Sequence, residues 1–72
     1  MKFMKYGVVI EKSDNGFGAY VPDLPGCAVV GDTVEDTKRL IESAVIMHLN
    51  AMRADGDLIP KPTTIVDYVE VV

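Results

Sequence analysis

The sequence contains few of the residues that cross-link a small domain or bind metals. Cys27 is the only cysteine and His48 the only histidine among the 72 residues. An intrachain disulfide is therefore excluded, and a metal site or other cofactor is not expected. No apolar run reaches the roughly 20 residues that cross a bilayer, and Met1–Val9 is too mixed to be an export signal. These absences predict a cytoplasmic protein without membrane contact.

Positive charge is also scarce. The chain carries 7 basic and 11 acidic side chains, which gives a net charge of -4 at neutral pH. A surface with this balance repels a phosphate backbone, so we expect no direct contact with nucleic acid. The same charge is compatible with a basic protein partner.

The length allows one domain, and we assign residues 1–72 to it. A domain of this size is only marginally stable unless a cross-link, a metal or a partner adds to its core. Since the first two are not expected and 49% of the residues are hydrophobic, we predict a homo-oligomer or a permanent complex.

The alternation of apolar residues predicts three strands, one helix and a final strand. Strands are expected at 3–12, 17–21 and 27–30, with a hairpin turn at 13–16 that contains Asn15 and Gly16. A β-branched run at 65–72 predicts the last strand. The expected fold is α+β with the order β-β-β-α-β, one small sheet covered by one helix.

The helix has clear signals at both ends. Thr33 is the expected N-cap, with acidic residues in the first turn, and Gly56 follows the expected end near Ala54. Glu35 and Arg39 have the spacing of a favourable ion pair.

The apolar arc of this helix covers about half of its circumference, more than one sheet requires. One interpretation is that a flank meets a second chain, with Ile46 and Leu49 at the oligomer interface. The alternative is a helix half-sunk in its own core, and the sequence leaves both open.

A loop stiffened by Pro22 and Pro25 follows the second strand. Such a loop loses little entropy when it binds, so it is our first candidate for partner contact. In the alternative interpretation Leu24 closes the bottom of the core and the prolines only shape a turn. The predicted partner-binding residues are Tyr20, Asp23, Leu24, Pro25 and Gly26.

Catalytic residues are not expected. His48 lies within the apolar arc, which is typical of a core or interfacial histidine, and no cation neighbours Cys27 to activate its thiol. A metal-dependent nuclease needs several converging acids, but alternation places Asp67 and Glu70 on opposite faces of their strand. We therefore predict that the chain is not an enzyme.

Three runs of the sequence carry a family resemblance. They are Gly-Ala-Tyr-Val-Pro-Asp-Leu-Pro-Gly-Cys at 18–27, Gly-Asp-Thr-Val-Glu-Asp at 31–36, and Asp-Gly-Asp-Leu-Ile-Pro-Lys-Pro at 55–62. In this order they resemble the HicB-like antitoxin family over nearly the whole chain. The resemblance implies a partial ribonuclease-H-like fold.

The resemblance also implies a partner, a HicA-like toxin. Such toxins are small basic ribonucleases that cleave mRNA, and the antitoxin neutralises them by covering the active-site surface. Many relatives add a C-terminal DNA-binding segment, which this sequence does not show before Val72. We therefore expect a short antitoxin without DNA binding of its own. The alternative is a stand-alone homo-oligomeric relative that has lost its toxin and has a structural or ligand-binding role.

Overall fold

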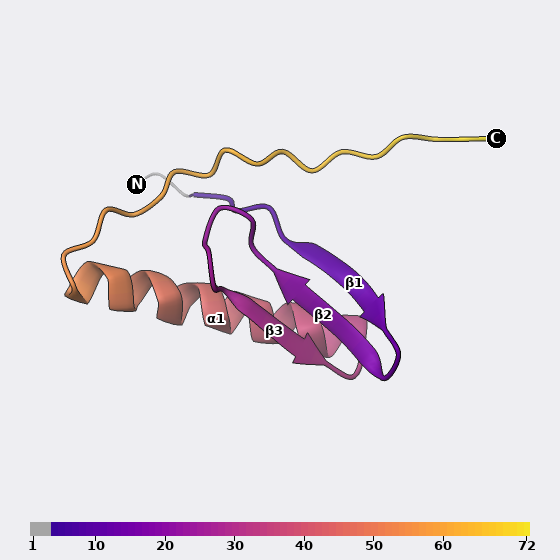
Figure 1. Cartoon of the computed structure of the whole chain (residues 1–72), viewed down its shortest axis with the longest axis horizontal. Helices are drawn as coiled ribbons and strands as arrows, with labels where there is room; N and C mark the ends of the chain where they lie inside the picture. The colour runs from indigo at the N-terminus through magenta and orange to yellow at the C-terminus, as the bar shows by residue number, and fades with distance from the viewer. Residues whose placement is uncertain (1–3) are drawn as a thin grey trace.

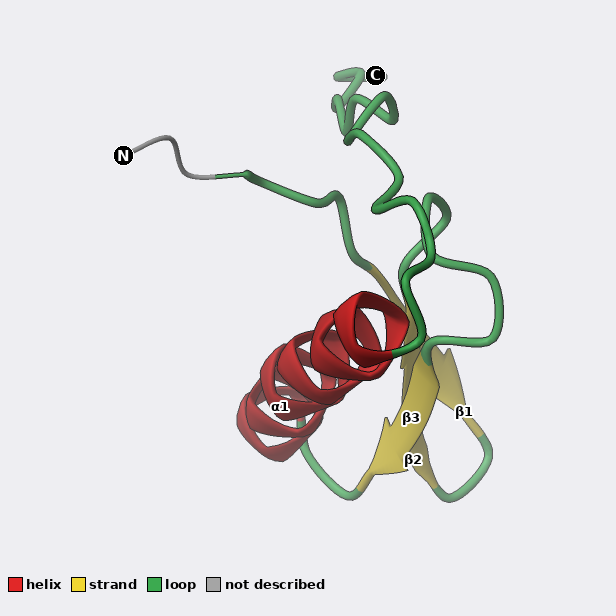
Figure 2. Cartoon of the chain, turned by 90° about the vertical axis from the view of Figure 1, so that its left-hand side faces the viewer, coloured by secondary structure: helices red, strands yellow, loops and turns green. Residues whose placement is uncertain are grey.

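The computed structural model of the chain describes residues 4–72 and contains three strands followed by one helix (Figure 1). The strands β1 (Val9–Ser13), β2 (Gly16–Tyr20) and β3 (Ala28–Gly31) are antiparallel and lie in the order β1-β2-β3. Helix α1 (Val34–Ala54) lies across one face of this sheet (Figure 2). The α+β class, with one small sheet and one covering helix, is confirmed.

The first two strands form the predicted hairpin. Their register pairs Ser13 with Gly16 at the turn and Val9 with Tyr20 at the far end. The first strand is predicted to begin at residue 3, which lies outside the described residues. In the structure the pairing of β1 with β2 starts only at Val9. The reason is that β2 ends at Tyr20, where the chain turns into the proline loop and leaves residues 4–8 without a partner strand.

The proline loop, residues 21–27, is closed by its own backbone. The N–H of Val21 donates to the carbonyl of Cys27 at 3.1 Å, and the N–H of Cys27 donates to the carbonyl of Leu24 at 3.0 Å. Gly26 has a φ of +83°, which only glycine adopts without strain. The loop is therefore a fixed turn whose shape is encoded locally.

Both predicted helix ends are confirmed. The hydroxyl of Thr33 accepts a hydrogen bond from the N–H of Asp36 at 3.0 Å, so Thr33 is the N-cap. After Ala54 the chain leaves the helix through Gly56, whose φ of +75° is that of a left-handed C-terminal cap.

The predicted ion pair in the first turns is replaced by another. Arg39 pairs with Asp36, three residues before it, and not with Glu35. Positions three and four apart are both neighbours on a helix surface, and the carboxylate at Asp36 also lies at the positive end of the helix dipole.

The core lies between the sheet and α1. Ile10, Ala19 and Val29 are cross-strand neighbours on the inner face of the sheet, and they pack with Ile41 and Leu49 of the helix. Alternation along the start of the chain places Met4, Tyr6, Val8 and Ile10 on one face. Tyr6, Val8 and Ile10 pack against this core, whereas Met4 is 44% exposed.

The predicted fourth strand does not form within this chain. Residues 65–72 are extended but join no strand of the sheet. The connector before them contains Pro60 and Pro62, which lack a backbone donor, and it is attached to the proline loop on its way past the sheet. Within the described residues the sheet therefore ends at β1.

Candidate partner-binding surface

The outer face of the sheet is free of helix in the described part of the chain. Side chains on this face alternate with those that enter the core, and the pairing of Val9 with Tyr20 and of Tyr20 with Ala28 defines it. Tyr20 is 43% and Val30 is 79% exposed. We call this surface the open face, and it consists of Val9, Glu11, Gly18, Tyr20, Ala28 and Val30.

The structure places the five predicted partner-binding residues in three different environments. Tyr20, Pro25 and Gly26 are exposed, and a partner can reach them. Leu24 is only 1% exposed and belongs to the core, so its side chain has the closing role that was the alternative interpretation. Asp23 is half-buried and already occupied by hydrogen bonds within the chain.

Asp23 joins the proline loop to the C-terminal connector. Its Oδ2 accepts hydrogen bonds from the backbone N–H groups of Thr63, at 2.9 Å, and of Thr64, at 3.0 Å. Its Oδ1 accepts from the hydroxyls of the same two threonines, at 3.1 and 2.8 Å. We call this arrangement the Asp23 clamp.

The clamp changes the acidity of the carboxyl group. The backbone N–H and then the hydroxyl of Thr64, followed by the donors of Thr63, lower the pKa of Asp23 from 3.8 to about 2. Each of these donors stabilises the ionised form. The carboxylate of Asp23 is therefore ionised and only accepts hydrogen bonds. Protonation of this carboxylate would weaken the clamp.

A second hydrogen bond holds the connector a few residues before the clamp. The hydroxyl of Tyr6 donates to the backbone carbonyl of Pro60. After the clamp, Val66 passes over Gly7, where a methyl group built on the glycine would lie 3.1 Å from its Cγ2. Residues 60–66 are thus held beside the start of the chain, and the segment after them leaves from a fixed point.

The two residues predicted for an oligomer interface lie at different depths. Ile46 is 61% exposed on the outside of α1 and is available for contact. Leu49 is only 8% exposed and packs in the chain's own core. For Leu49 the structure therefore shows the half-sunk helix that was the alternative.

Cys27 and His48 line the same shallow hollow, which Met47 borders. A thiol becomes a nucleophile when a nearby cation lowers its pKa. Here burial raises the pKa of Cys27, and no hydrogen bond joins it to His48 in the described part of the chain. The thiol therefore stays protonated and acts as a small apolar group of the core.

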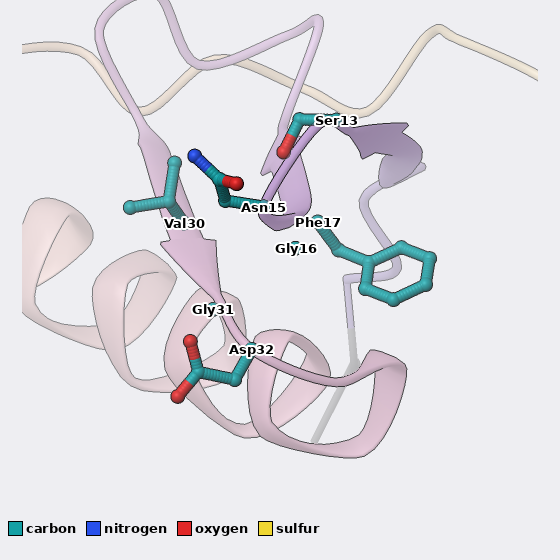
Figure 3. Close-up of a pocket in the computed structure, with 7 residues that line it drawn as sticks. All are labelled: Ser13, Asn15, Gly16, Phe17, Val30, Gly31 and Asp32. Carbon is teal, nitrogen blue, oxygen red and sulfur yellow. The ribbon is translucent and has the colours of Figure 1, made fainter.

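The hollow at the hairpin end offers little chemistry. It lies between the turn of β1 and β2 and the end of β3 (Figure 3) and has a volume of about 300 Å³. Asp32 is its only ionisable side chain, beside the neutral groups of Ser13 and Asn15. Among residues 4–72, no three histidine, cysteine or acidic side chains are close enough to share a metal ion. No helix in that range is long and apolar enough to cross a membrane.

Thr63 and Thr64 were missed in the sequence. Two hydroxyl residues after a Pro-Lys-Pro run read as an ordinary polar connector. Their donors meet Asp23 some forty residues away in the chain, and no local pattern predicts such a contact. The nearest available signal was Asp23 itself, an acid within a rigid loop.

Comparisons with known proteins agree with this architecture. A chain in a solved HicA3 and HicB3 toxin-antitoxin complex superposes with a TM-score of 0.71 at 34% identity, covering 82% of this chain and 69% of that one. A UPF0150 protein of Helicobacter pylori is 40% identical over 52 residues, or 72% of each chain. A UPF0150 protein of Synechocystis is 36% identical over 62 residues, 85% of this chain and 78% of the relative.

A longer relative and a family model complete the comparison. An uncharacterized 14.9 kDa protein of Haemophilus phage HP1 is 35% identical over 66 residues, which make up 92% of this chain but half of that protein. The model of the HicB-like antitoxins of bacterial toxin-antitoxin systems matches residues 6–71, and so includes both the proline loop and the C-terminal segment. The chain belongs to the HicB-like antitoxin family.

Proposed function

We propose that this chain neutralises a HicA-like toxin, a small basic ribonuclease, by covering its active-site surface in the cytoplasm. The observation that carries the proposal is the likeness of 82% of this chain to one from a HicA3 and HicB3 complex. The family match spans residues 6–71, which include the sheet, the helix and the loop between β2 and β3. It thus includes the surfaces through which a partner would be bound.

The toxin would bind to the open face and the adjoining edge of the proline loop. Tyr20 and Val30 present apolar area to solvent there, and aromatic side chains are enriched among the residues that dominate binding energy. Pro25 and Gly26 lie on a loop whose closing hydrogen bonds fix its shape before binding. Little conformational entropy would be lost on complex formation.

Charge supports the same assignment. A net charge of -4 complements a basic partner and mimics the charge of the RNA that the partner cleaves. Long-range attraction of this kind accelerates association and is screened by salt. Affinity should therefore fall as ionic strength rises, with most of the change in the association rate.

Titration calorimetry against the small basic protein encoded beside this chain tests the proposal. Tyr20→Ala and Val30→Lys are expected to weaken binding at least tenfold, because both change the open face. Ser43→Lys, at an exposed position of α1, is the matched control and should bind like the parent chain. Absence of binding by the parent chain, or equal affinity of all three variants, would refute the assignment.

We also propose that the chain has no catalytic activity of its own. The thiol of Cys27 is held protonated by burial, and the Asp23 carboxylate is occupied by four hydrogen bonds. Neither group is then available as a nucleophile or a general base. Inhibition of the toxin should accordingly be stoichiometric, with complete loss of mRNA cleavage at one antitoxin site per toxin. Turnover of RNA by the purified chain would contradict this.

The second candidate function is a stand-alone homo-oligomer without a toxin. It is favoured by the exposed Ile46 on α1 and by the apolar C-terminal segment, neither of which is covered within the chain. Sedimentation of the pure chain tests it, since a stable monomer would exclude it. A homo-oligomer is also compatible with toxin binding, because the open face lies on the other side of the sheet from α1.

A further inference from the structure

The C-terminal segment exposes more apolar surface than a folded chain normally leaves in water. We call residues 65–72 the tail. Its side chains at Ile65, Tyr68, Val69, Val71 and Val72 are all at least 86% exposed. Contiguous exposed apolar surface of this kind marks a site of association. The tail is thus built to be covered by something that the single chain does not provide.

The residue pattern of the tail is that of a strand with apolar side chains on both faces. β-branched and aromatic residues dominate it, as in strands. Alternation puts Ile65, Asp67, Val69 and Val71 on one face and Val66, Tyr68, Glu70 and Val72 on the other. Each face holds one acid and three apolar residues. A strand facing water on one side would instead alternate between apolar and polar residues.

The tail cannot easily reach its own sheet. The Asp23 clamp and the contact of Val66 with Gly7 fix the point at which the tail begins. From there it runs away from the sheet, and both views place it apart from β1 (Figures 1 and 2). Figure 1 shows the tail running in the same left-to-right sense as β1 but diverging from it, so pairing with its own β1 would require the tail to bend sharply towards that strand directly after Val66. The clamp therefore aims the tail outwards, towards another molecule.

The β1 edge of the sheet is unpaired in the described part of the chain and lies beside an apolar hollow. β1 is an edge strand, so its outer backbone groups face no partner strand in the described part of the chain. Helix α1 packs mainly on β2 and β3, which leaves a hollow of about 330 Å³ between α1 and the start of the chain. Apolar side chains make up most of its lining, which is Met4, Tyr6, Val8, Ile41, Glu42, Val45 and Ile46.

We infer that two copies of this chain exchange their tails, each tail pairing as a fourth strand with the β1 edge of the other copy. Pairing satisfies the backbone groups of an edge strand that would otherwise promote aggregation. One face of the exchanged strand covers the apolar hollow beside α1. The exchange also explains why Ile46, at the rim of this hollow, is exposed in the single chain.

The strand that pairs with the β1 edge comes from a second copy of this chain and not from the toxin, because this chain itself carries both apolar surfaces. The tail and the hollow are both apolar and both belong to this chain, so each copy supplies one of each and a two-fold dimer satisfies both. The inference concerns only copies of this chain. It can fail while toxin binding to the open face holds, and it can hold while toxin binding fails.

Sedimentation equilibrium of three forms of the full chain is the first test. The parent chain is expected to be a dimer. Val69→Pro removes a backbone donor from the middle of the tail, where the single chain makes no contact, and should weaken dimerisation at least tenfold. Met47→Lys, an exposed change elsewhere on α1, should leave the dimer intact. A monomeric parent chain, or a Val69→Pro chain that dimerises like the parent, would overturn the inference.

Thiol cross-linking distinguishes exchange from a tail that folds back on its own sheet. In a Cys27→Ala background, one chain carries Lys12→Cys on β1 and another carries Val69→Cys in the tail. A short bismaleimide should join the two chains when they are mixed, giving a product of dimer mass. In a single chain that carries both cysteines, a cross-linked product of monomer mass only would show an unexchanged tail and refute the inference. Circular dichroism of each variant confirms that the body of the chain is folded.

Discussion

Asp23 and Thr64 are joined by two hydrogen bonds across a separation of 41 residues in the chain. The backbone N–H of Thr64 donates to Oδ2 at 3.0 Å, and its hydroxyl donates to Oδ1 at 2.8 Å. Through this contact the proline loop, which lies beside the open face, also fixes the start of the tail. One carboxylate thus couples the surface proposed for toxin binding to the segment proposed for dimerisation.

Replacing this carboxylate by an amide should release the connector while leaving the core intact. Asp23→Asn keeps the size of the side chain but removes the charge and one of its two acceptor oxygens. We expect a lower melting temperature and faster amide exchange at Thr63 and Thr64. Asp67→Asn is the control, because Asp67 lies in the tail and contacts no part of the loop. Equal amide exchange in both variants would show that the clamp contributes nothing.

The contribution of the clamp to stability should also depend on pH, within a defined acidic range. The pKa of Asp23 is lowered to about 2 in the folded chain, so the folded state binds this proton more weakly than the unfolded state does. Its contribution to stability is complete well above pH 3.8, decreases as the pH falls below that value and is lost below about pH 2. The amide resonances of Thr63 and Thr64 should follow this titration. A midpoint near 4 for both resonances would contradict the clamp.

Gly31 should not tolerate a side chain. A methyl group built on Gly31 would lie 2.5 Å from Oγ1 of Thr37, which is fully buried and donates to the carbonyl of Thr33. Gly31→Ala is therefore expected to destabilise the fold by about 1–3 kcal/mol, the usual cost of overpacking. Gly18→Ala is the matched control, since its nearest neighbour would be at an ordinary 3.8 Å. Urea unfolding of both variants measures the difference.

Leu24 should affect stability more than partner affinity. Because its side chain is almost fully buried, Leu24→Ala should lower the free energy of unfolding by about 2–5 kcal/mol. Pro25→Ala, at the exposed neighbour, is expected to cost less than about 1 kcal/mol. Chemical denaturation tests the first effect, and toxin titration of the folded fraction tests the second. A normally stable Leu24→Ala chain with greatly weakened toxin binding would restore Leu24 to the contact surface.

The sequence predicted those features that depend on neighbouring residues. The hairpin turn follows from Asn15 and Gly16, and the helix start and end follow from Thr33 and Gly56, because each acts on backbone groups within a few positions. The inward face of Tyr6, Val8 and Ile10 follows from simple alternation. The family resemblance was also visible in the sequence, since its motifs are short runs in a fixed order.

The burial of Leu24 and Leu49 was harder to predict. An apolar residue on a loop or on a broad helical arc has the same local pattern whether it faces a core or a partner. The placement of the helix over β2 and β3 decides between the two, and this depends on packing between distant segments.

The sequence by itself determined the acidic charge, the first three strands and the helix, with the local turns and caps that define each of these elements. Tertiary structure alone decided that Asp23 holds Thr63 and Thr64 and that residues 65–72 stay outside the sheet. The physical reason is that a strand needs a partner edge within reach. Whether an edge is within reach depends on where the rest of the chain has fixed its starting point.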